Sequence, residues 1–250
     1  MSRIIAMASG KGGVGKTTLC ASIAAALAQF GKSVIVIDTN LTTANLGLHL
    51  GMPFYPVTLQ DVLKKRARLK DAIYYHNAGF GIIPASISVE HVMVPKQNDI
   101  IDAAYKAASL ADIVLLDSAA GLGREASAAL QAADEVLIVT NPEMPAITDA
   151  LKLSKIAQQY EVRRLGYILN RVRMEKHEIS RREIQELLEL PFFGIVQEDR
   201  RVKEAIAARM PVVLHRPRAK VSRQIKAVAA RLANMQYKET LSDMFFGWFR

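Results

Sequence analysis

The sequence predicts an α/β fold, in which helices flank a doubly wound, mostly parallel sheet. Short apolar runs alternate with longer segments of helical period along the 250 residues, and such alternation is typical of βα units. The apolar runs are almost uninterrupted, as expected for strands that helices cover on both faces of a sheet. No linker or low-complexity segment divides the chain, so we expect one large domain over residues 1–236 and a short amphipathic segment over 237–250.

The expected elements follow one another in a regular order. Within the first helix, for example, Leu19, Ile23 and Leu27 recur at a spacing that places them on one face. The expected strands are Ile4–Ala8, Ser33–Asp38, Gly81–Pro84, Ile113–Asp117, Glu135–Thr140, Arg164–Asn170 and Phe192–Val196. The expected helices are Lys16–Phe30, Leu59–Leu69, Asp99–Leu110, Arg124–Ala133, Ala146–Tyr160, Ser180–Leu190 and Arg200–Ala208, with a final surface helix in the basic stretch Arg216–Met235.

A glycine-rich turn joins the first strand to the first helix. Residues 10–18 read Gly-Lys-Gly-Gly-Val-Gly-Lys-Thr-Thr and satisfy the phosphate-binding pattern G-x-x-x-x-G-K-[ST]. In such a turn backbone N–H groups point at phosphates, the helix dipole favours negative charge, and Lys16 adds a full positive charge. The hydroxyl of Thr17 is suited to bind Mg²⁺. The expected nucleotide-binding residues of this turn are Gly10, Lys11, Gly12, Gly13, Val14, Gly15, Lys16, Thr17 and Thr18.

A second lysine, Lys11, lies directly after the first glycine of this turn, where the general pattern does not require one. Its position beside the phosphates favours a catalytic role, in which it reaches the nucleotide of a neighbouring subunit as an arginine finger does. A solvated surface lysine is the alternative.

Four further segments follow the turn along the chain, namely Ile35–Asn40 with Ala44–Leu46, Leu115–Gly121, Thr140–Glu143 and Leu169–Arg171. The turn and these segments, in this order, resemble the MinD/ParA group of deviant Walker A ATPases, and most of all its MinD branch. The resemblance covers residues 1 to about 232. It implies a P-loop NTPase fold, binding of ATP and Mg²⁺, hydrolysis of ATP to ADP and phosphate, and a homodimer in the ATP state.

The resemblance also implies roles for polar residues at the ends of strands. Asp117 is the expected Walker B-type carboxylate, which holds Mg²⁺ together with Thr17, and Asp38 is expected to support the metal or the glycine-rich turn. A strand-end carboxylate that caps a turn is the alternative for both. Asn170 is expected to read the adenine edge, because an amide offers a donor and an acceptor; a turn-forming asparagine is its alternative.

Asn40 departs from the family pattern. In MinD-like proteins this run usually reads Asp-x-Asp, and the second carboxylate helps to activate the attacking water; here it reads Asp38-Thr39-Asn40. An amide positions water through hydrogen bonds but cannot take up a proton. We therefore expect a catalytic set of Lys11, Lys16 and Asn40 with slow turnover, so that the ATP-bound state accumulates.

The net charge of +9 comes from the last third of the chain. Residues 162–250 contain 19 Lys and Arg against 10 Asp and Glu, whereas residues 1–161 contain 14 of each. This distribution favours attraction to an anionic membrane or to nucleic acid, with a solvated basic face as the alternative.

The chain has a single cysteine, Cys20, which we expect to pack in the core. One cysteine cannot form a disulfide within the chain, so we expect a reducing cytoplasm. The lack of further cysteines also argues against relatives that hold iron–sulfur clusters, because such clusters need several thiolates.

The last residues form an amphipathic stripe. Wound as a helix, the segment places its large apolar side chains on one face and Ser242, Asp243 and Arg250 on the other. This pattern predicts a short interfacial membrane helix, where the resemblance also places the membrane-targeting sequence of MinD; a tail folded back on its own domain is the alternative. The expected membrane-contacting residues are Leu241, Met244, Phe245, Phe246, Trp248 and Phe249.

Together these features predict an ATP-dependent dimerising switch that attaches to the inner face of the cell membrane in the ATP state. It would help to position a division site or surface machinery, with an activator or adaptor protein as a further partner. The alternative is a ParA-like DNA-partitioning ATPase that uses the basic third on phosphates, although the aromatic tail argues against nucleic acid. A flagellar-placement relative stays open. A small-molecule enzyme on the same fold ranks lower, because no separate substrate-binding segment is present.

Overall fold

The computed structural model describes residues 2–88 and 97–237. Its centre is an eight-stranded sheet with the strand order β3-β4-β2-β5-β1-β6-β7-β8. All neighbouring strands pair in parallel except β3, which is antiparallel to β4. The strands are β1 (Arg3–Ser9), β2 (Val34–Asp38), β3 (Tyr74–Tyr75), β4 (Gly81–Ile83), β5 (Ile113–Ala120), β6 (Glu135–Thr140), β7 (Arg163–Val172) and β8 (Phe192–Gln197). The doubly wound α/β fold is thereby confirmed.

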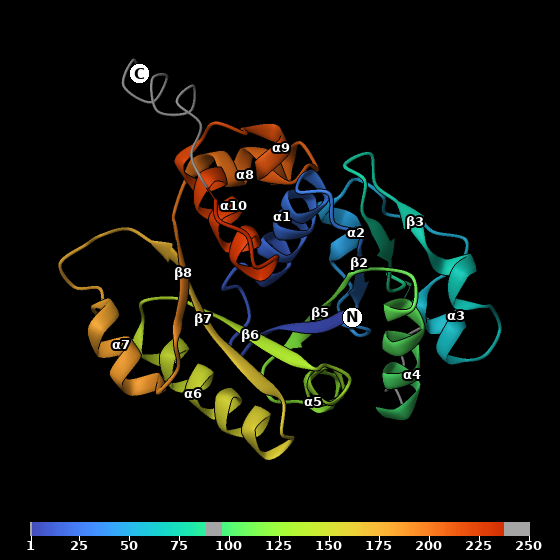
Figure 1. Cartoon of the computed structure of the whole chain (residues 1–250), viewed down its shortest axis with the longest axis horizontal. Helices are drawn as coiled ribbons and strands as arrows, with labels where there is room; N and C mark the ends of the chain where they lie inside the picture. Colours follow the sequence, from blue (N-terminus) through green and yellow to red (C-terminus); the bar gives the residue numbers. More distant parts are fainter. Residues whose placement is uncertain (1, 89–96, 238–250) are drawn as a thin grey trace.

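Helices cover both faces of the sheet (Figure 1). One buried cluster joins the sheet to α1 (Lys16–Gln29), α2 (Leu46–His49), α8 (Arg200–Ala207), α9 (Val212–His215) and α10 (Lys220–Leu232). Two further clusters join the opposite face to the remaining helices. These are α3 (Leu59–Leu63), the 3₁₀ turn η1 (Leu69–Ala72), α4 (Gln97–Ala108), α5 (Arg124–Gln131), α6 (Met144–Gln159) and α7 (Arg181–Leu188). Alternate residues of β1 belong to different clusters, which is why its sequence is apolar throughout.

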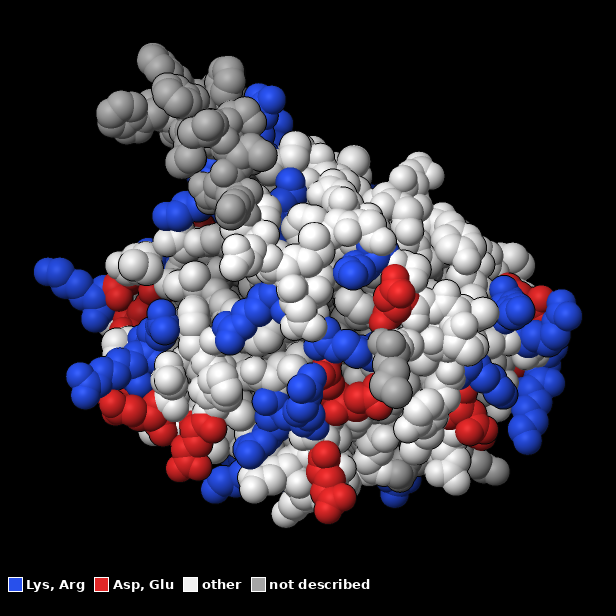
Figure 2. Space-filling view, in the orientation of Figure 1, with Lys and Arg blue, Asp and Glu red and all other residues white. Residues whose placement is uncertain are grey.

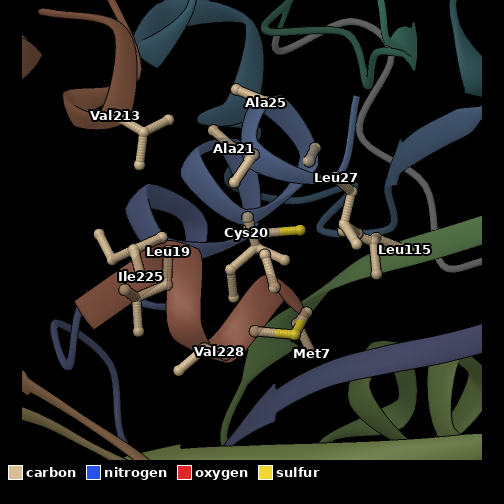
Figure 3. Close-up of a cluster of buried hydrophobic side chains, with 14 of the residues drawn as sticks. Met7, Leu19, Cys20, Ala21, Ala25, Leu27, Leu115, Val213, Ile225 and Val228 are labelled. Atoms are coloured by element: carbon tan, nitrogen blue, oxygen red, sulfur yellow. The ribbon is translucent and has the colours of Figure 1, made fainter. Parts of the chain in front are cut away.

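The helix α1 packs against α10 in the middle of the first layer. Cys20 is fully buried there, in the same apolar cluster as Leu19, Ile225 and Val228, and its sulfur points to the side of Leu27 and Leu115 (Figure 3). The predicted core position of Cys20 is confirmed. The predicted surface helix is confirmed, because α10 exposes Lys220 and Arg231 while it buries its inner face, but the predicted bounds 216–235 are wrong: the helix begins only at Lys220, after an extended Ala219, and ends at Leu232.

The predicted helix over 59–69 is also wrong in its length. The structure ends α3 at Leu63, and Lys65 takes a left-handed backbone with φ of 58°. A side chain with a Cβ is rare in that region, and one such residue is sufficient to end an α-helix. The chain then turns and forms η1. The short elements α2, η1, β3 and α9 were not predicted.

Candidate nucleotide-binding site

The glycine-rich turn lies at the carboxyl edge of the sheet, between the end of β1 at Ser9 and the start of α1 at Lys16. Gly13 and Gly15 have positive φ angles of 78° and 90°. Gly15 is the N-cap of α1, so no side chain caps the first N–H groups of the helix, and no acidic residue lies in its first turn. The positive end of a 14-residue helix therefore stays available to an anion.

At two positions of the turn a neighbouring segment lies so close that only glycine fits. A Cβ on Gly10 would lie 2.4 Å from the backbone carbonyl carbon of Asp149 in α6. A Cβ on Gly15 would lie 2.5 Å from the side-chain nitrogen of Asn170 at the end of β7. The turn is thus held against α6 and β7, and larger residues at these positions would displace its backbone from the sheet edge.

Lys16 and Asp117 form a buried ion pair. The distance from Lys16 Nζ to Asp117 Oδ1 is 2.6 Å, and the two side chains are 7% and 2% exposed. Asp117 is brought there by β5, which neighbours β1 directly. A cation and a carboxylate that are both withdrawn from water stabilise each other only when they stay together. The structure therefore joins the two charged groups that the sequence assigned to phosphate and metal.

Asp38 ends the next strand, β2, opposite Asp117 in the register of the sheet. Its buried carboxylate accepts hydrogen bonds from the backbone N–H groups of Asn40, Asn45 and Leu46, at 3.1, 3.3 and 3.2 Å. Burial, and then the negative charge of Asp117, raise the pKa of Asp38 to about 7. The carboxylate oxygens thus hold the loop after β2, while the excess negative charge at the two strand ends favours a nearby cation.

The oxygen donors at this edge suit an Mg²⁺ ion that is shared with the phosphates of a substrate. Among residues 2–88 and 97–237 no group of three or more His, Cys, Asp or Glu side chains could hold a metal ion by itself. Thr17 lines the cavity beside the turn, and Asp117 is the ion-pair partner of Lys16, which lines the same cavity. Mg²⁺ binds through one or two protein oxygens, waters and substrate phosphates, rather than in an all-protein cage. A hydroxyl and a carboxylate beside a phosphate-binding turn meet that requirement.

Asn40 is held within its own loop. Its Nδ2 donates to the carbonyl oxygen of Thr43 at 2.7 Å, and its Oδ1 accepts from the Thr43 hydroxyl at 3.0 Å. The residue also lines the cavity that faces the glycine-rich turn. Its amide therefore shapes the loop and borders the place where a nucleotide's phosphates would lie.

Lys11 lies at the mouth of the turn. Its side chain is about half exposed, and its Nζ is 3.7 Å from a carboxylate oxygen of Glu143. Unlike Lys16, it does not contribute to the lining of the cavity. A lysine in this place stays accessible to a second molecule, and its role across a dimer remains a prediction.

Asn170 is buried at the end of β7. Its Nδ2 donates to the carbonyl oxygen of Val14 at 2.6 Å, which ties the glycine-rich turn to the sheet over a sequence distance of 156 residues. The same residue lines a smaller hollow beside Gly15 and Thr18. The structure thus gives the amide a definite partner within the turn, and base recognition remains a prediction for it.

The cavity at this edge has a volume of about 780 Å³. It is lined by the glycine-rich turn, by the loop after β2 and by the segment after β5. Sequence reasoning missed several of its lining residues, namely His49, Arg124, Glu125, Arg171 and Ile206. Arg171 directly follows Asn170, so its proximity to the site could have been inferred, whereas Ile206 of α8 carries no such signal in the sequence.

Comparison with known proteins places this geometry in a family. The family model of the CobQ/CobB/MinD/ParA nucleotide binding domain matches residues 5–212. An ATP-binding protein of Methanocaldococcus jannaschii is 40% identical over 96% of this chain and 91% of its own length. The septum site-determining protein MinD of Synechocystis sp. is 30% identical over 93% of this chain and 90% of its own. The antiactivator FleN of Pseudomonas aeruginosa is also 30% identical, over 92% and 86%.

Solved structures of related proteins have the same fold. The cell division ATPase MinD of Pyrococcus furiosus superposes with a TM-score of 0.90 at 32% identity, covering 94% of this chain and 99% of that one. MinD of Pyrococcus horikoshii, solved in complex with Mg-ADP, gives 0.89 at 33% identity, covering 93% and 96%. The resemblance deduced from the motifs is confirmed, and the chain belongs to the MinD/ParA family of nucleotide-binding proteins.

Proposed function

We propose that the protein is a MinD-like switch: it binds ATP with Mg²⁺ at residues 10–18, forms a homodimer with ATP bound, and then associates with an anionic membrane. The observation that carries this proposal is the buried pair that Lys16, the first residue of α1, forms with Asp117 at the uncapped end of that helix. The Mg-ADP complex of a relative at 33% identity supports the choice of ligand.

Different residues of the site are proposed to bind the phosphates, the metal ion and the base. The N–H groups of the turn and of the first turn of α1 would donate hydrogen bonds to the phosphate oxygens. Lys16 contributes a cation that is already desolvated, so little water has to be removed from it on binding. Thr17 and Asp117 would hold Mg²⁺, which, when bound, neutralises phosphate charge. Asn170 and the hollow beside Thr18 are the candidate place for the base.

Hydrolysis is proposed to be slow because of Asn40. Its amide is engaged with Thr43 and has no proton-accepting group to offer water. An Asn40→Asp variant restores a carboxylate of nearly the same shape. We expect its steady-state phosphate release to be at least about tenfold faster than that of the unchanged protein.

The control for this experiment is Lys16→Ala in both backgrounds, which removes activity that does not arise from this site. Equal rates for the unchanged protein and the Asn40→Asp variant, after subtraction of that background, would show that residue 40 does not limit turnover.

Membrane association is proposed to depend on the C-terminal segment. Its apolar residues Leu241, Met244, Phe245, Phe246, Trp248 and Phe249 lie outside the described residues. No helix in the part of the chain that the structure describes is long and apolar enough to cross a membrane. One short amphipathic segment binds weakly, whereas two on a dimer gain about 10²–10⁴ in avidity, so ATP-driven dimerisation would control attachment from the cytoplasmic side.

Flotation with anionic liposomes tests this part of the proposal. We expect binding that requires ATP and Mg²⁺ and that disappears when residues 240–250 are deleted. Binding by the truncated protein at the level of the full chain would contradict it.

The proposal for a cellular role rests on the relatives rather than on the site. Proteins named septum site-determining and antiactivator occur among relatives at 30% identity, so we propose that the switch helps to position a cellular structure, through an adaptor or activator protein. MinD of Aquifex aeolicus has been solved in complex with MinC, at 29% identity to this chain.

DNA partitioning remains the second candidate, because the last third of the chain is basic. On the face that Figure 2 shows, Lys and Arg side chains are interspersed with Asp and Glu. Ion pairs such as Arg182 with Glu186 and Arg216 with Glu204 neutralise part of the basic third. A continuous track for phosphates requires unpaired cations of one sign. A DNA shift assay beside the liposome assay, each with and without ATP, separates the two functions.

A further inference from the structure

A second cationic feature lies away from the nucleotide site. Residues 64–70 read Lys-Lys-Arg-Ala-Arg-Leu-Lys, so five of seven consecutive residues are basic although residues 1–161 carry no net charge. The run connects α3 to η1, and it borders a hollow of about 700 Å³ together with the C-terminal end of α4. Of the residues that the structure describes, none lines both this hollow and the nucleotide cavity. We call this feature the basic hollow.

The connection that presents these cations is fixed by the fold. Lys65 turns the backbone with φ of 58°, and the N–H of Arg66 then donates to the carbonyl oxygen of Asp61 at 2.8 Å. The guanidinium of Arg68 forms two hydrogen bonds with the carboxylate of Asp71, at 3.0 and 2.9 Å. Leu69 is only 6% exposed and anchors the run in the core. A ligand would therefore meet a preformed surface and would not have to order it.

Four cations around the basic hollow are free to act on a partner. Lys65, Arg66, Lys70 and Lys106 are exposed, and none forms an ion pair with a carboxylate among residues 2–88 and 97–237. Arg68 differs, because Asp71 already neutralises it. Unpaired charges of one sign around a concave surface attract a ligand of opposite charge and set its orientation.

The hollow also has an apolar part. Val62, Leu69 and Leu110 contribute to its lining, and Leu110 is 41% exposed. Within the described part of the chain no aromatic ring lines it, so this lining lacks the stacking platforms that single-stranded nucleic acids use. A membrane presents a flat surface, whereas this surface is concave. The combination of apolar floor and cationic rim matches a chain segment that carries apolar side chains between carboxylates.

We propose that the basic hollow is a docking site for an acidic, amphipathic segment of a partner protein. The carboxylates of the segment pair with Lys65, Arg66, Lys70 and Lys106, and one or two of its apolar side chains enter between Val62 and Leu110. The site is separate from the nucleotide cavity, because none of these residues belongs to the lining of that cavity.

Fluorescence anisotropy with a labelled peptide tests the proposal on the full chain. The probe is a twelve-residue peptide with leucines spaced three and four apart among glutamates. Two matched peptides replace either the leucines by serine or the glutamates by lysine. The test variant is Arg66→Glu with Lys106→Glu; the control is Lys155→Glu with Lys220→Glu, which makes the same charge change at exposed positions elsewhere.

We expect saturable binding of the acidic leucine peptide, weakened at least about tenfold by the test variant and less than about twofold by the control variant. Replacing the leucines by serine should weaken binding by about fivefold or more. Affinity for ATP, and thermal stability, should be the same in both variants and the unchanged protein.

Three results would overturn the proposal. The first is an equal loss of affinity in the control variant, which would mean attraction by net charge alone. The second is undiminished binding of the serine peptide, which would mean that the hollow receives no apolar side chain. The third is tighter binding of duplex DNA or anionic vesicles than of the peptide through Arg66 and Lys106, which would assign the cations to another class of partner.

Discussion

Gly13 and Gly15 of the phosphate-binding loop both have positive φ angles, but only at Gly15 would an added Cβ clash with a neighbouring side chain. A Cβ on Gly13 would meet nothing within 4 Å, whereas a Cβ on Gly15 would lie 2.5 Å from Asn170 Nδ2. Alanine at either position costs about 1–2 kcal/mol for the left-handed backbone. Alanine at Gly15 must also displace the Asn170 amide from Val14, and loss of a buried hydrogen bond costs about 1–3 kcal/mol more.

Thermal unfolding of the nucleotide-free protein, followed by circular dichroism, measures the difference. A loss of about 1 kcal/mol lowers the melting temperature of a domain of this size by about 2–4 °C. We therefore expect Gly15→Ala to melt about 6 °C below Gly13→Ala, for an extra cost of about 2 kcal/mol. An Asn170→Ala background lacks the obstructing amide. In that background Gly13→Ala and Gly15→Ala should lower the melting temperature of the parent by the same amount.

Equal melting temperatures for Gly13→Ala and Gly15→Ala would refute the reasoning, since the contact with Asn170 would then carry no energy. The same holds if the Asn170→Ala background leaves the difference between the two variants unchanged.

Two further predictions concern the core and the buried carboxylates. Ile225→Ala, between α10 and α1, should lower the free energy of unfolding by about 2–5 kcal/mol, and the exposed Ala227→Ser by about 0.5 kcal/mol, measured by urea titration. Asp38 has a pKa of about 7 in the fold against an ordinary value of 3.8. Between these two pH values the folded chain therefore keeps a proton on Asp38 that the unfolded chain has released. Its contribution to stability is full below pH 3.8 and is lost as the pH rises to about 7. Asp38→Asn should flatten the dependence of the urea midpoint between these values; an unaltered slope would show that Asp38 is ionised throughout.

The strands and the glycine-rich turn could be predicted from sequence because each depends on local pattern. The apolar runs are buried on both faces, and the turn requires glycine where φ is positive. The end of α3 could not be predicted, because Lys65 is not a residue type that signals a left-handed backbone. The elements α2 and β3 are four and two residues long, which is shorter than any periodicity can reveal.

The polar contacts of the site were beyond sequence reasoning for a different reason. The amide of Asn170 holds Val14, and the carboxylate of Asp38 holds three backbone N–H groups of the following loop. Both contacts depend on how distant segments, or the turns of a loop, are placed in space. Sequence identified the residues correctly as members of one edge, because parallel strands bring their carboxyl ends together, but it could not give their partners.

Titration calorimetry with ATP and Mg²⁺ tests the central claim most directly, namely that residues 10–18 bind the phosphates of a nucleotide. The unchanged protein should bind ATP at one site per chain. A Lys16→Met variant, shown to be folded by its melting curve, should bind at least about a hundredfold more weakly, because a desolvated charge on the phosphates is lost. No heat of binding at millimolar ATP, or the same affinity with and without the lysine, would contradict the account.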